Sequence, residues 1–341
     1  MNKKYLWGII IVLSISAGVL YFDLRNIPIR QLQHVAQNIN PVGLLLVFGL
    51  MLASYLFEAT TLAVLAKSQN EPQRSKWAFF RIPIIQALFN AITPMSTGGQ
   101  PSQLAAMIQM GIEGGRATSL LVMKFIIYQV VVFFAYGVTI ITGFQMVATK
   151  FAGLALLIAI GFLIHISSIA FLLATLFAYT WTKKVTNVLM TFLAKFVDAK
   201  RVASWQKNVM AKIDSFYQES QKLKKEKKKL LLCCGLTILQ LLCFYSIPFM
   251  ILVALNISAD WINVTQMNIM ITMLMAVVPI PGASGGAEYS FQKLFASFVS
   301  SKESLIVGMF LWRFVTYFFG MILGIGGWIF KPKRVVDQQN D

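Results

Sequence analysis

Long apolar runs cover most of this chain, and they are longer than the core elements of a soluble domain. Each run approaches or exceeds the roughly 18–20 residues that a helix needs to cross a bilayer. There is no succession of ten-residue segments with alternating apolar and polar positions, the pattern of a membrane barrel. The predicted fold is therefore all-α and polytopic, with these candidate spans: Tyr5–Phe22, Val42–Ala66, Ser119–Met146, Phe151–Trp181, Leu230–Leu255 and Ser304–Phe330.

The composition points the same way. Of the 341 residues, 57% are hydrophobic and 13% are charged, and the mean hydropathy is +0.69. A soluble domain of this size needs more polar surface than that. The first apolar run follows Met-Asn-Lys-Lys and is long for the core of a signal peptide, so we expect an uncleaved signal anchor.

The formal net charge of +17 is concentrated in one polar segment. Between Thr182 and Lys229 there are 13 Lys or Arg residues and 4 Asp or Glu residues, and the segment ends in "KLKKEKKK". Positive loops stay in the cytoplasm and are attracted to anionic lipid head groups. Because apolar residues recur at helical spacing, as at Val185, Val188 and Phe192, we expect an amphipathic helix on the membrane surface. We do not expect nucleic-acid binding, the alternative reading of a basic segment.

The positive-inside rule places the first half of the chain relative to the membrane. The cationic stretch from Lys67 to Arg81 follows the second span and should be cytoplasmic, and counting back from the basic segment makes Arg116 cytoplasmic too. The apolar residues between these cations must then enter the membrane and return without crossing it. We predict a re-entrant hairpin over about 82–110, with its turn in "TPMSTGGQPSQ". Such a turn must be buried in protein or line a wet cavity.

The second half of the chain leads to the mirror-image arrangement. The span Leu230–Leu255 runs outward from the basic segment, and the cationic tail Lys331–Arg334 should be inside. A segment of about 266–299 must then enter from outside and return there, with its turn in "PIPGASGGAEYS". Both termini are cytoplasmic in this scheme. The predicted organisation is a membrane half at 1–181, a basic linker at 182–229 and a second membrane half at 230–341.

Short sequence matches suggest that the two halves are inverted repeats. In the first half, "STGGQ" precedes "KFIIY" (Lys124–Tyr128), and in the second half "SGGAE" precedes "RFVTY" (Arg313–Tyr317). Each unit thus has a turn rich in helix breakers, a short helix, and a span with a cation followed four residues later by Tyr. Chance similarity between apolar sequences is the alternative explanation. Many transporters are built from inverted repeats with broken helices, and they bind substrate where the repeats meet.

Ionisable residues inside the predicted spans are the first candidates for chemistry, because each is costly in a bilayer unless it is paired. They are Glu58, Lys124, Glu288 and Arg313. Glu288 and Arg313 could instead form a purely structural ion pair. Lys124 could extend to the cytoplasmic surface, or Glu58 could be its partner. We interpret His165 as a packing residue.

The two glycine pairs, Gly98–Gly99 and Gly285–Gly286, each precede a predicted short helix. Glycine lets the backbone approach a ligand closely, and free N–H groups at a helix N-terminus bind anions such as phosphate. Two such termini, each backed by a cation, would hold an anionic head group near mid-membrane. The alternative is that the glycines only permit tight turns. The predicted substrate-binding set is Glu58, Gly98, Gly99, Gln100, Lys124, Tyr128, Gly285, Gly286, Glu288, Arg313 and Tyr317.

Motifs for catalysis are absent from the sequence. There is no Ser–His–Asp arrangement, no GxxxxGK[ST], no HExxH, no paired carboxylate motif and no Cys/His cluster. Cys233, Cys234 and Cys243 share one apolar segment and lack metal-site spacing. We therefore predict no catalytic residue, no metal and no cofactor.

Three stretches, "TPMSTGGQPSQ", "PIPGASGGAE" and "WRFVTYFFG", together resemble the lysylphosphatidylglycerol synthase/flippase transmembrane family. The resemblance covers essentially the whole chain, and the family includes the membrane domain of the bacterial multiple peptide resistance factor. Family members often have a glutamate after the first glycine pair, where this chain has Gln100. That departure argues against a titratable carboxylate in the first hairpin.

The resemblance implies a multi-pass protein of the bacterial plasma membrane that handles anionic or aminoacylated phospholipid, such as (lysyl-)phosphatidylglycerol. In full-length members a soluble C-terminal domain transfers lysine from lysyl-tRNA to phosphatidylglycerol, and the membrane domain exposes the product outside. This sequence ends eleven residues after Phe330, so we expect a stand-alone lipid flippase. The alternatives are a phosphatidylglycerol lysyltransferase or another lipid-modifying enzyme, or the membrane subunit or scaffold of a separate aminoacyltransferase or glycosyltransferase. Homo-oligomerisation stays open.

Overall fold

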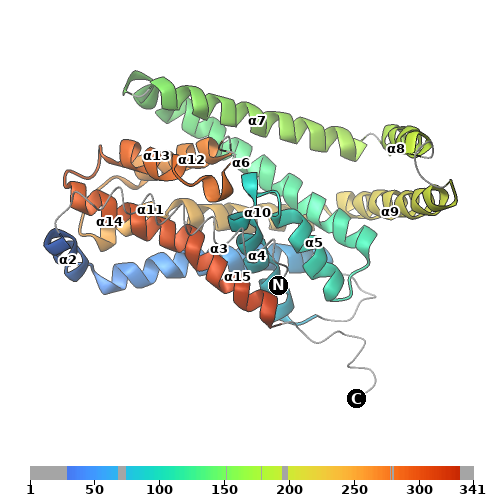
Figure 1. Ribbon diagram of the computed structural model, residues 1–341, viewed down its shortest axis with the longest axis horizontal. Helices are drawn as coiled ribbons and strands as arrows, with labels where there is room; N and C mark the ends of the chain where they lie inside the picture. Colours follow the sequence, from blue (N-terminus) through green and yellow to red (C-terminus); the bar gives the residue numbers. More distant parts are fainter. Residues whose placement is uncertain are drawn as a thin grey trace, which may run out of the picture.

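The computed structural model describes residues 29–67, 74–150, 152–177, 179–193, 199–276, 278 and 280–330. Over these residues the chain is helical and contains no β-strand (Figure 1), so the predicted all-α fold is confirmed. The elements are α2 (Ile29–Gln37), α3 (Pro41–Ala66), α4 (Lys76–Ile92), η1 (Pro94–Ser96), α5 (Gly99–Gln109), α6 (Gly114–Lys150), α7 (Ala152–Phe177), α8 (Tyr179–Leu193), α9 (Ala199–Lys225), α10 (Lys227–Tyr245), α11 (Ile247–Ala254), α12 (Trp261–Met275), η2 (Pro281–Ala283), α13 (Gly286–Phe295), α14 (Lys302–Arg313), η3 (Phe314–Phe318) and α15 (Phe319–Ile329).

Four helical stretches in the described part of the chain are long and apolar enough to cross a membrane: Pro41–Ala66, Gly114–Gly143, Lys227–Ala254 and Lys302–Ile329. They coincide with four of the predicted spans. In the predicted span 151–181, α7 contains a shorter apolar helix, Gly153–Ser167. The predicted first span, 5–22, and the cationic tail, 331–334, lie outside the described residues.

Polar caps determine where several of these helices begin. Asn40, Ser75, Asp260 and Ser301 precede α3, α4, α12 and α14, and each accepts a hydrogen bond from a backbone N–H of the first turn. Such caps satisfy donors that have no partner within the helix. The apolar residues that follow can then be buried without leaving these N–H groups unpaired.

Two units of the fold consist of a helix, a short break and a second helix. The first broken-helix unit is α4–η1–α5, and the second is α12–η2–α13. Their breaks share an unusual backbone, with positive φ at Met95 and Ser96 in the first unit and at Gly282 and Ala283 in the second. The two breaks pack against each other, and η2 also packs against α4. The breaks therefore bring the two halves of the chain into contact.

The helices that enter the two predicted hairpin ranges start before those ranges. We predicted hairpins over about 82–110 and 266–299, and α4 begins at Lys76 and α12 at Trp261. In the first unit the Ser75 cap starts the helix before the apolar run. Arg81, which we assigned to a cytoplasmic loop, lies inside α4 and is only 1% exposed. Its Nε donates a hydrogen bond to the carbonyl of Gly327 in α15 at 2.5 Å.

Other cations bind the carbonyl groups at helix C-termini. Arg116 donates to the carbonyl of Ala66 at 2.8 Å, and Lys229 donates to that of Lys67 at 2.9 Å, so both interact with the end of α3. Arg74, just before α4, donates at 3.3 Å to two carbonyls at the end of α5. Cations are favourable at this negative end of the helix dipole. The Arg74 contacts hold the start and the end of the first broken-helix unit together.

The second broken-helix unit starts at a distant point of the bundle. Gln266, in the second turn of α12, donates a hydrogen bond to Thr142 of α6 at 2.7 Å. The first unit starts near the other end of α6, because Arg74, just before α4, donates to the carbonyls of Met110 and Gly111, and Arg116 follows five residues later in the first turn of α6. At a rise of 1.5 Å per residue, these two positions of α6 are about 39 Å apart. The two units therefore begin near opposite ends of α6.

The basic segment folds as two helices that are tied to each other. Lys183 of α8 forms an ion pair with Asp214 of α9 at 2.7 Å, and the hydroxyl of Tyr179 donates to the same carboxylate at 2.6 Å. The hydrogen bond from Lys183, and to a smaller extent the one from Tyr179, lowers the pKa of Asp214. On α8, Trp181 and Val188 are exposed. Helix α8 lies in the stretch where the spacing predicted an amphipathic helix, and residues 194–198 lie outside the described chain.

Candidate functional site

The second broken-helix unit turns through a backbone that favours small residues. Gly282, Ala283 and Gly285 have φ values of 61°, 51° and 88°. α13 then begins, and Glu288 folds back so that its Oε2 accepts a hydrogen bond from the Gly285 N–H at 2.7 Å. A carboxylate in the first turn is also stabilised by the positive end of the helix dipole. The break thus holds Glu288 in a fixed position.

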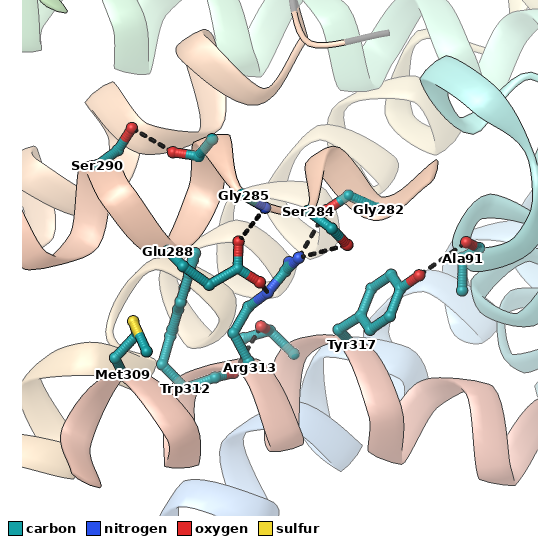
Figure 2. A network of polar contacts seen from close by, with 12 residues as sticks. Ala91, Gly282, Ser284, Gly285, Glu288, Ser290, Met309, Trp312, Arg313 and Tyr317 are labelled. Atoms are coloured by element: carbon teal, nitrogen blue, oxygen red, sulfur yellow. Dashed lines mark hydrogen bonds and ion pairs between the residues drawn. The ribbon is translucent and has the colours of Figure 1, made fainter. Parts of the chain in front are cut away.

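Arg313 at the end of α14 binds this break at three points (Figure 2). Its Nε donates to Glu288 Oε1 at 2.6 Å, and its Nη2 donates to the carbonyl of Gly282 at 2.9 Å and to Ser284 Oγ at 3.3 Å. Arg313 and Glu288 are each 5% exposed. Buried ion pairs are tolerated when further hydrogen bonds satisfy their polar atoms. The result is a neutral cross-link between η2, α13 and α14.

Tyr317 connects this cross-link to the first broken-helix unit. Its ring centroid lies 4.8 Å from the guanidinium carbon of Arg313, which is a cation–π contact. Its hydroxyl donates to the carbonyl of Ala91 in α4 at 2.8 Å (Figure 2). Tyr317 lies in η3, a π-helical turn of the kind that is frequent at functional sites. We call Gly282, Ser284, Glu288, Arg313 and Tyr317 the Arg313 cluster.

A second buried ion pair joins Lys124 of α6 to Glu58 of α3. Lys124 is 8% exposed and Glu58 is 7% exposed. Gln103 of α5 donates to Glu58 Oε1 at 3.0 Å, and Gln240 of α10 donates to Glu58 Oε2 at 3.2 Å. Gln103 also donates to the side chain of Gln86 in α4. We call these five residues, one from each of five helices, the Glu58 cluster.

The two units are alike in their cations and differ in the origin of the carboxylate. α5 begins at Gly99 and α13 at Gly286. Counted from these glycines, the position of Glu288 corresponds to Pro101, not to Gln100, where the family comparison led us to look. Arg313 of α14 therefore receives its carboxylate from α13 of the second broken-helix unit. Lys124 of α6 receives one from α3, which lies outside the first broken-helix unit.

Two N–H groups at the glycine pairs already have partners. The Gly98 N–H donates to Thr93 Oγ1 at 2.9 Å, and the Gly285 N–H donates to Glu288. Gly99 is buried, and a Cβ there would lie 1.9 Å from Asn90 Oδ1. These glycines thus contribute to the turns and their packing. Anion binding at the N-termini of α5 and α13 stays a prediction, and Lys124 and Arg313 are the buried cations of the two clusters.

The other predicted site residues are placed as follows. Gln100 is exposed, and it lies outside both clusters. Tyr128 is half-buried and packs against the apolar core, whereas its counterpart Tyr317 contacts the cation of its unit. His165 packs edge-to-face on Tyr136 at 4.8 Å, as expected of a packing residue.

Sequence reasoning missed the polar residues that complete both clusters. Gln103 and Gln240 donate to Glu58, Gln86 accepts from Gln103, and Ser284 accepts from Arg313. A side-chain amide within an apolar stretch could have indicated these glutamines, because an unpaired amide is costly to bury. Within the described residues, no group of three or more His, Cys, Asp or Glu side chains is placed to hold a metal ion.

Comparison with known proteins bears on the origin of this arrangement. The sequence model of a family described as the lysylphosphatidylglycerol synthase TM region matches residues 7–324. A UPF0104 membrane protein of Archaeoglobus fulgidus is 28% identical over 267 residues, which cover 74% of this chain and 76% of that protein. The family match includes both broken-helix units and both buried ion pairs. The chain therefore belongs to the family of lysylphosphatidylglycerol synthase transmembrane regions.

Proposed function

We propose that the protein is a lipid translocase that moves an anionic or aminoacylated phospholipid, such as (lysyl-)phosphatidylglycerol, between the leaflets of the membrane. One observation carries the proposal: two broken helices, one from each half of the chain, pack against each other at their breaks, and each unit is bound to a buried cation. Substrate sites of secondary transporters lie where broken helices of two repeats meet. Family membership supports a role in lipid handling.

The chemistry of the two clusters fits a phospholipid head group. Lys124 and Arg313 supply positive charge for a phosphate, and guanidinium and ammonium groups both bind phosphate well. Glu58 and Glu288 supply negative charge for the ammonium of an aminoacylated head group. We propose that the acyl chains stay in the bilayer and that the head group passes between the two breaks. The membrane concerned is the bacterial plasma membrane.

We also propose that the broken-helix units are re-entrant hairpins that enter from opposite faces of the membrane, with both termini in the cytoplasm. Two observations support this. Arg74 ties the start of the first unit to its end, just before α6. Thr142, which contacts the second turn of α12, lies about 39 Å along α6 from Arg116 in the first turn of that helix. The cations at the ends of α3 and α5 favour the cytoplasm for the ends of the first unit. Exposed Trp181 and Val188 would place α8 at the membrane surface.

Cysteine accessibility tests the opposed hairpins. In a background with Cys233, Cys234 and Cys243 replaced by alanine, we expect Glu113→Cys, after the first unit, to react with an impermeant maleimide only from the cytoplasmic side. Ser300→Cys, after the second unit, is expected to react only from outside, because the two units return to the face from which they entered. Labelling of both cysteines from the same side in intact cells and inverted vesicles would contradict the arrangement.

Reconstitution tests the translocase itself. Liposomes that contain the protein and a short-chain fluorescent phosphatidylglycerol are expected to release lipid from the inner leaflet to external albumin, at least tenfold faster than protein-free liposomes. Two double variants, Arg313→Met with Glu288→Met and Lys124→Met with Glu58→Met, are expected to lose this activity. Each removes one cation without leaving an unpaired buried charge, so the protein should still fold.

The matched control for these variants is Lys183→Met with Asp214→Asn, which removes an ion pair from the surface of the α8–α9 region. We expect this control to keep the wild-type rate. A wild-type rate equal to that of empty liposomes would refute the translocase. Full activity in both Met/Met variants would show that the two clusters do not carry the head group.

A further inference from the structure

The two cations that would bind a lipid phosphate are already occupied in this structure. Lys124 is paired with Glu58, and Arg313 is paired with Glu288. Each pair is buried and electrically neutral, and a second anion cannot join a neutral buried pair without a large desolvation cost. An anionic head group can therefore reach either cation only if the carboxylate beside it moves away or becomes neutral. This requirement links the binding of lipid to the charge of a glutamate.

We propose that Glu58 is a proton-binding site that couples movement of the anionic head group to proton uptake. The inference rests on the proposed lipid translocase, and it adds the co-transported ion. In the lipid-free state Glu58 is a carboxylate paired with Lys124. When the phosphate of a head group binds Lys124, Glu58 takes up one proton and releases the ammonium group. The lipid therefore enters together with a proton.

The charge balance of this exchange is exact. Before binding, the ammonium of Lys124 and the carboxylate of Glu58 sum to zero. The phosphodiester brings one negative charge and the proton brings one positive charge. Afterwards the ammonium–phosphate pair and the uncharged carboxylic acid again sum to zero. Only the O–H bond of Glu58 forms, and the site remains neutral throughout, as burial requires.

The surroundings of Glu58 suit both protonation states. Apart from Lys124, its hydrogen-bond partners are the side-chain amides of Gln103 and Gln240. An amide presents N–H donors on one side and a carbonyl acceptor on the other, so rotation lets it donate to a carboxylate or accept from a carboxylic acid. The Gln103 carbonyl already faces Lys124 Nζ at 3.4 Å. A side-chain amide beside Glu58 can therefore accept the O–H of the protonated acid, in place of the hydrogen bond that Lys124 gives up.

Glu288 lacks this freedom. Its two oxygens accept from Arg313 and from the backbone N–H of Gly285, both of which can only donate. Its place in the first turn of α13 also favours the charged form through the helix dipole. Protonation would thus break a helix cap as well as an ion pair. Glu288 is a fixed counter-charge, and Glu58 is the exchangeable one.

The other titratable or charged groups near Glu58 stay in one charge state at neutral pH. Tyr55 lies one turn before Glu58 on α3, Tyr128 lies one turn after Lys124 on α6, and phenols are neutral at this pH. Cys233 of α10 packs against the carbonyl of Thr61 one turn further along α3. The uncharged Gln103 of α5 contacts Glu58, and Gln103 in turn contacts the uncharged Gln86 of α4. Lys124 is thus the charged side chain that contacts it.

Proton uptake on lipid binding is the direct test. We expect purified protein in weakly buffered detergent, with a pH-sensitive dye, to take up about one proton for each dihexanoyl-phosphatidylglycerol bound, as the charge balance requires. In liposomes the translocation rate is expected to rise as the pH falls from 8 to 6. Glu58→Gln should abolish both the uptake and the pH dependence, while Glu303→Gln, at the start of α14, should retain both.

The outcomes separate this inference from the proposed function. Translocation that is independent of pH, with no proton uptake in the wild type, overturns the coupling and leaves the translocase intact. Proton uptake that persists in Glu58→Gln overturns the assignment to this residue. Absence of translocation at every pH removes the proposed function and the coupling together. The wild-type measurement is decisive even if Glu58→Gln does not fold, and Glu58→Asp, which keeps a carboxylate, should preserve the uptake.

Discussion

Replacing Arg313 alone with methionine is expected to destabilise the protein by about 3–5 kcal/mol, the usual cost of breaking one side of a buried ion pair. The single variant leaves the Glu288 carboxylate buried, and among the described residues the Gly285 N–H remains as its hydrogen-bond partner. The double variant, Arg313→Met with Glu288→Met, leaves no such charge, and most of the stability should return. The difference in stability is measured as a difference in unfolding temperature. The detergent-solubilised proteins are heated, and unfolding is monitored by the loss of the monodisperse peak on size exclusion.

The control for this comparison is Lys183→Met, which leaves Asp214 without its ion-pair partner on a solvated surface. Exposed ion pairs contribute little to stability, so its unfolding temperature should stay close to that of the wild type. If the single Arg313 variant unfolds at the same temperature as the double variant, the Arg313–Glu288 pair is not the buried cross-link that the structure indicates.

The second large effect is expected from Gly282→Ala. Gly282 has a φ of 61°, and a Cβ there would lie 2.2 Å from the ring of Tyr317. The left-handed backbone costs roughly 1–2 kcal/mol for a residue with a side chain, and overpacking typically costs a further 1–3 kcal/mol. Because the Tyr317 ring is held by Arg313 and Ala91, it cannot move aside freely. We expect a lower unfolding temperature and a weaker contact between the two units.

Gly285→Ala is the matched control for this prediction. Gly285 also has a positive φ, of 88°, but a Cβ there would meet no atom within 4 Å. This variant should show only the backbone strain. Adding Tyr317→Ala to Gly282→Ala should recover part of the loss by removing the clash. Equal destabilisation by the two alanine variants would mean that Tyr317 is not packed against the break.

The sequence identified the buried charges because their cost in an apolar span singles them out. Glu58, Lys124, Glu288 and Arg313 could be named without a structure, and the spacing of Glu288 from Arg313 placed them in one unit. The N–H groups of Gly98 and Gly285 have partners that the sequence did not reveal. The nearby side chains of Thr93 and Glu288 accept hydrogen bonds from these N–H groups. Such capping bonds produce no periodic pattern of residues from which they could have been predicted.

The apolar runs alone determined that this is an all-α membrane protein with long helices, and the helix breakers marked both interruptions. Burial in a bilayer is a property of each segment, so it can be read segment by segment. Only the tertiary structure decided which charges meet. The Glu58 cluster draws on positions between 58 and 240, and the contact from Tyr317 to Ala91 spans 226 residues. Such pairings depend on how five helices pack around one point, and hydrophobic pattern does not encode the rotation or depth of one helix against another.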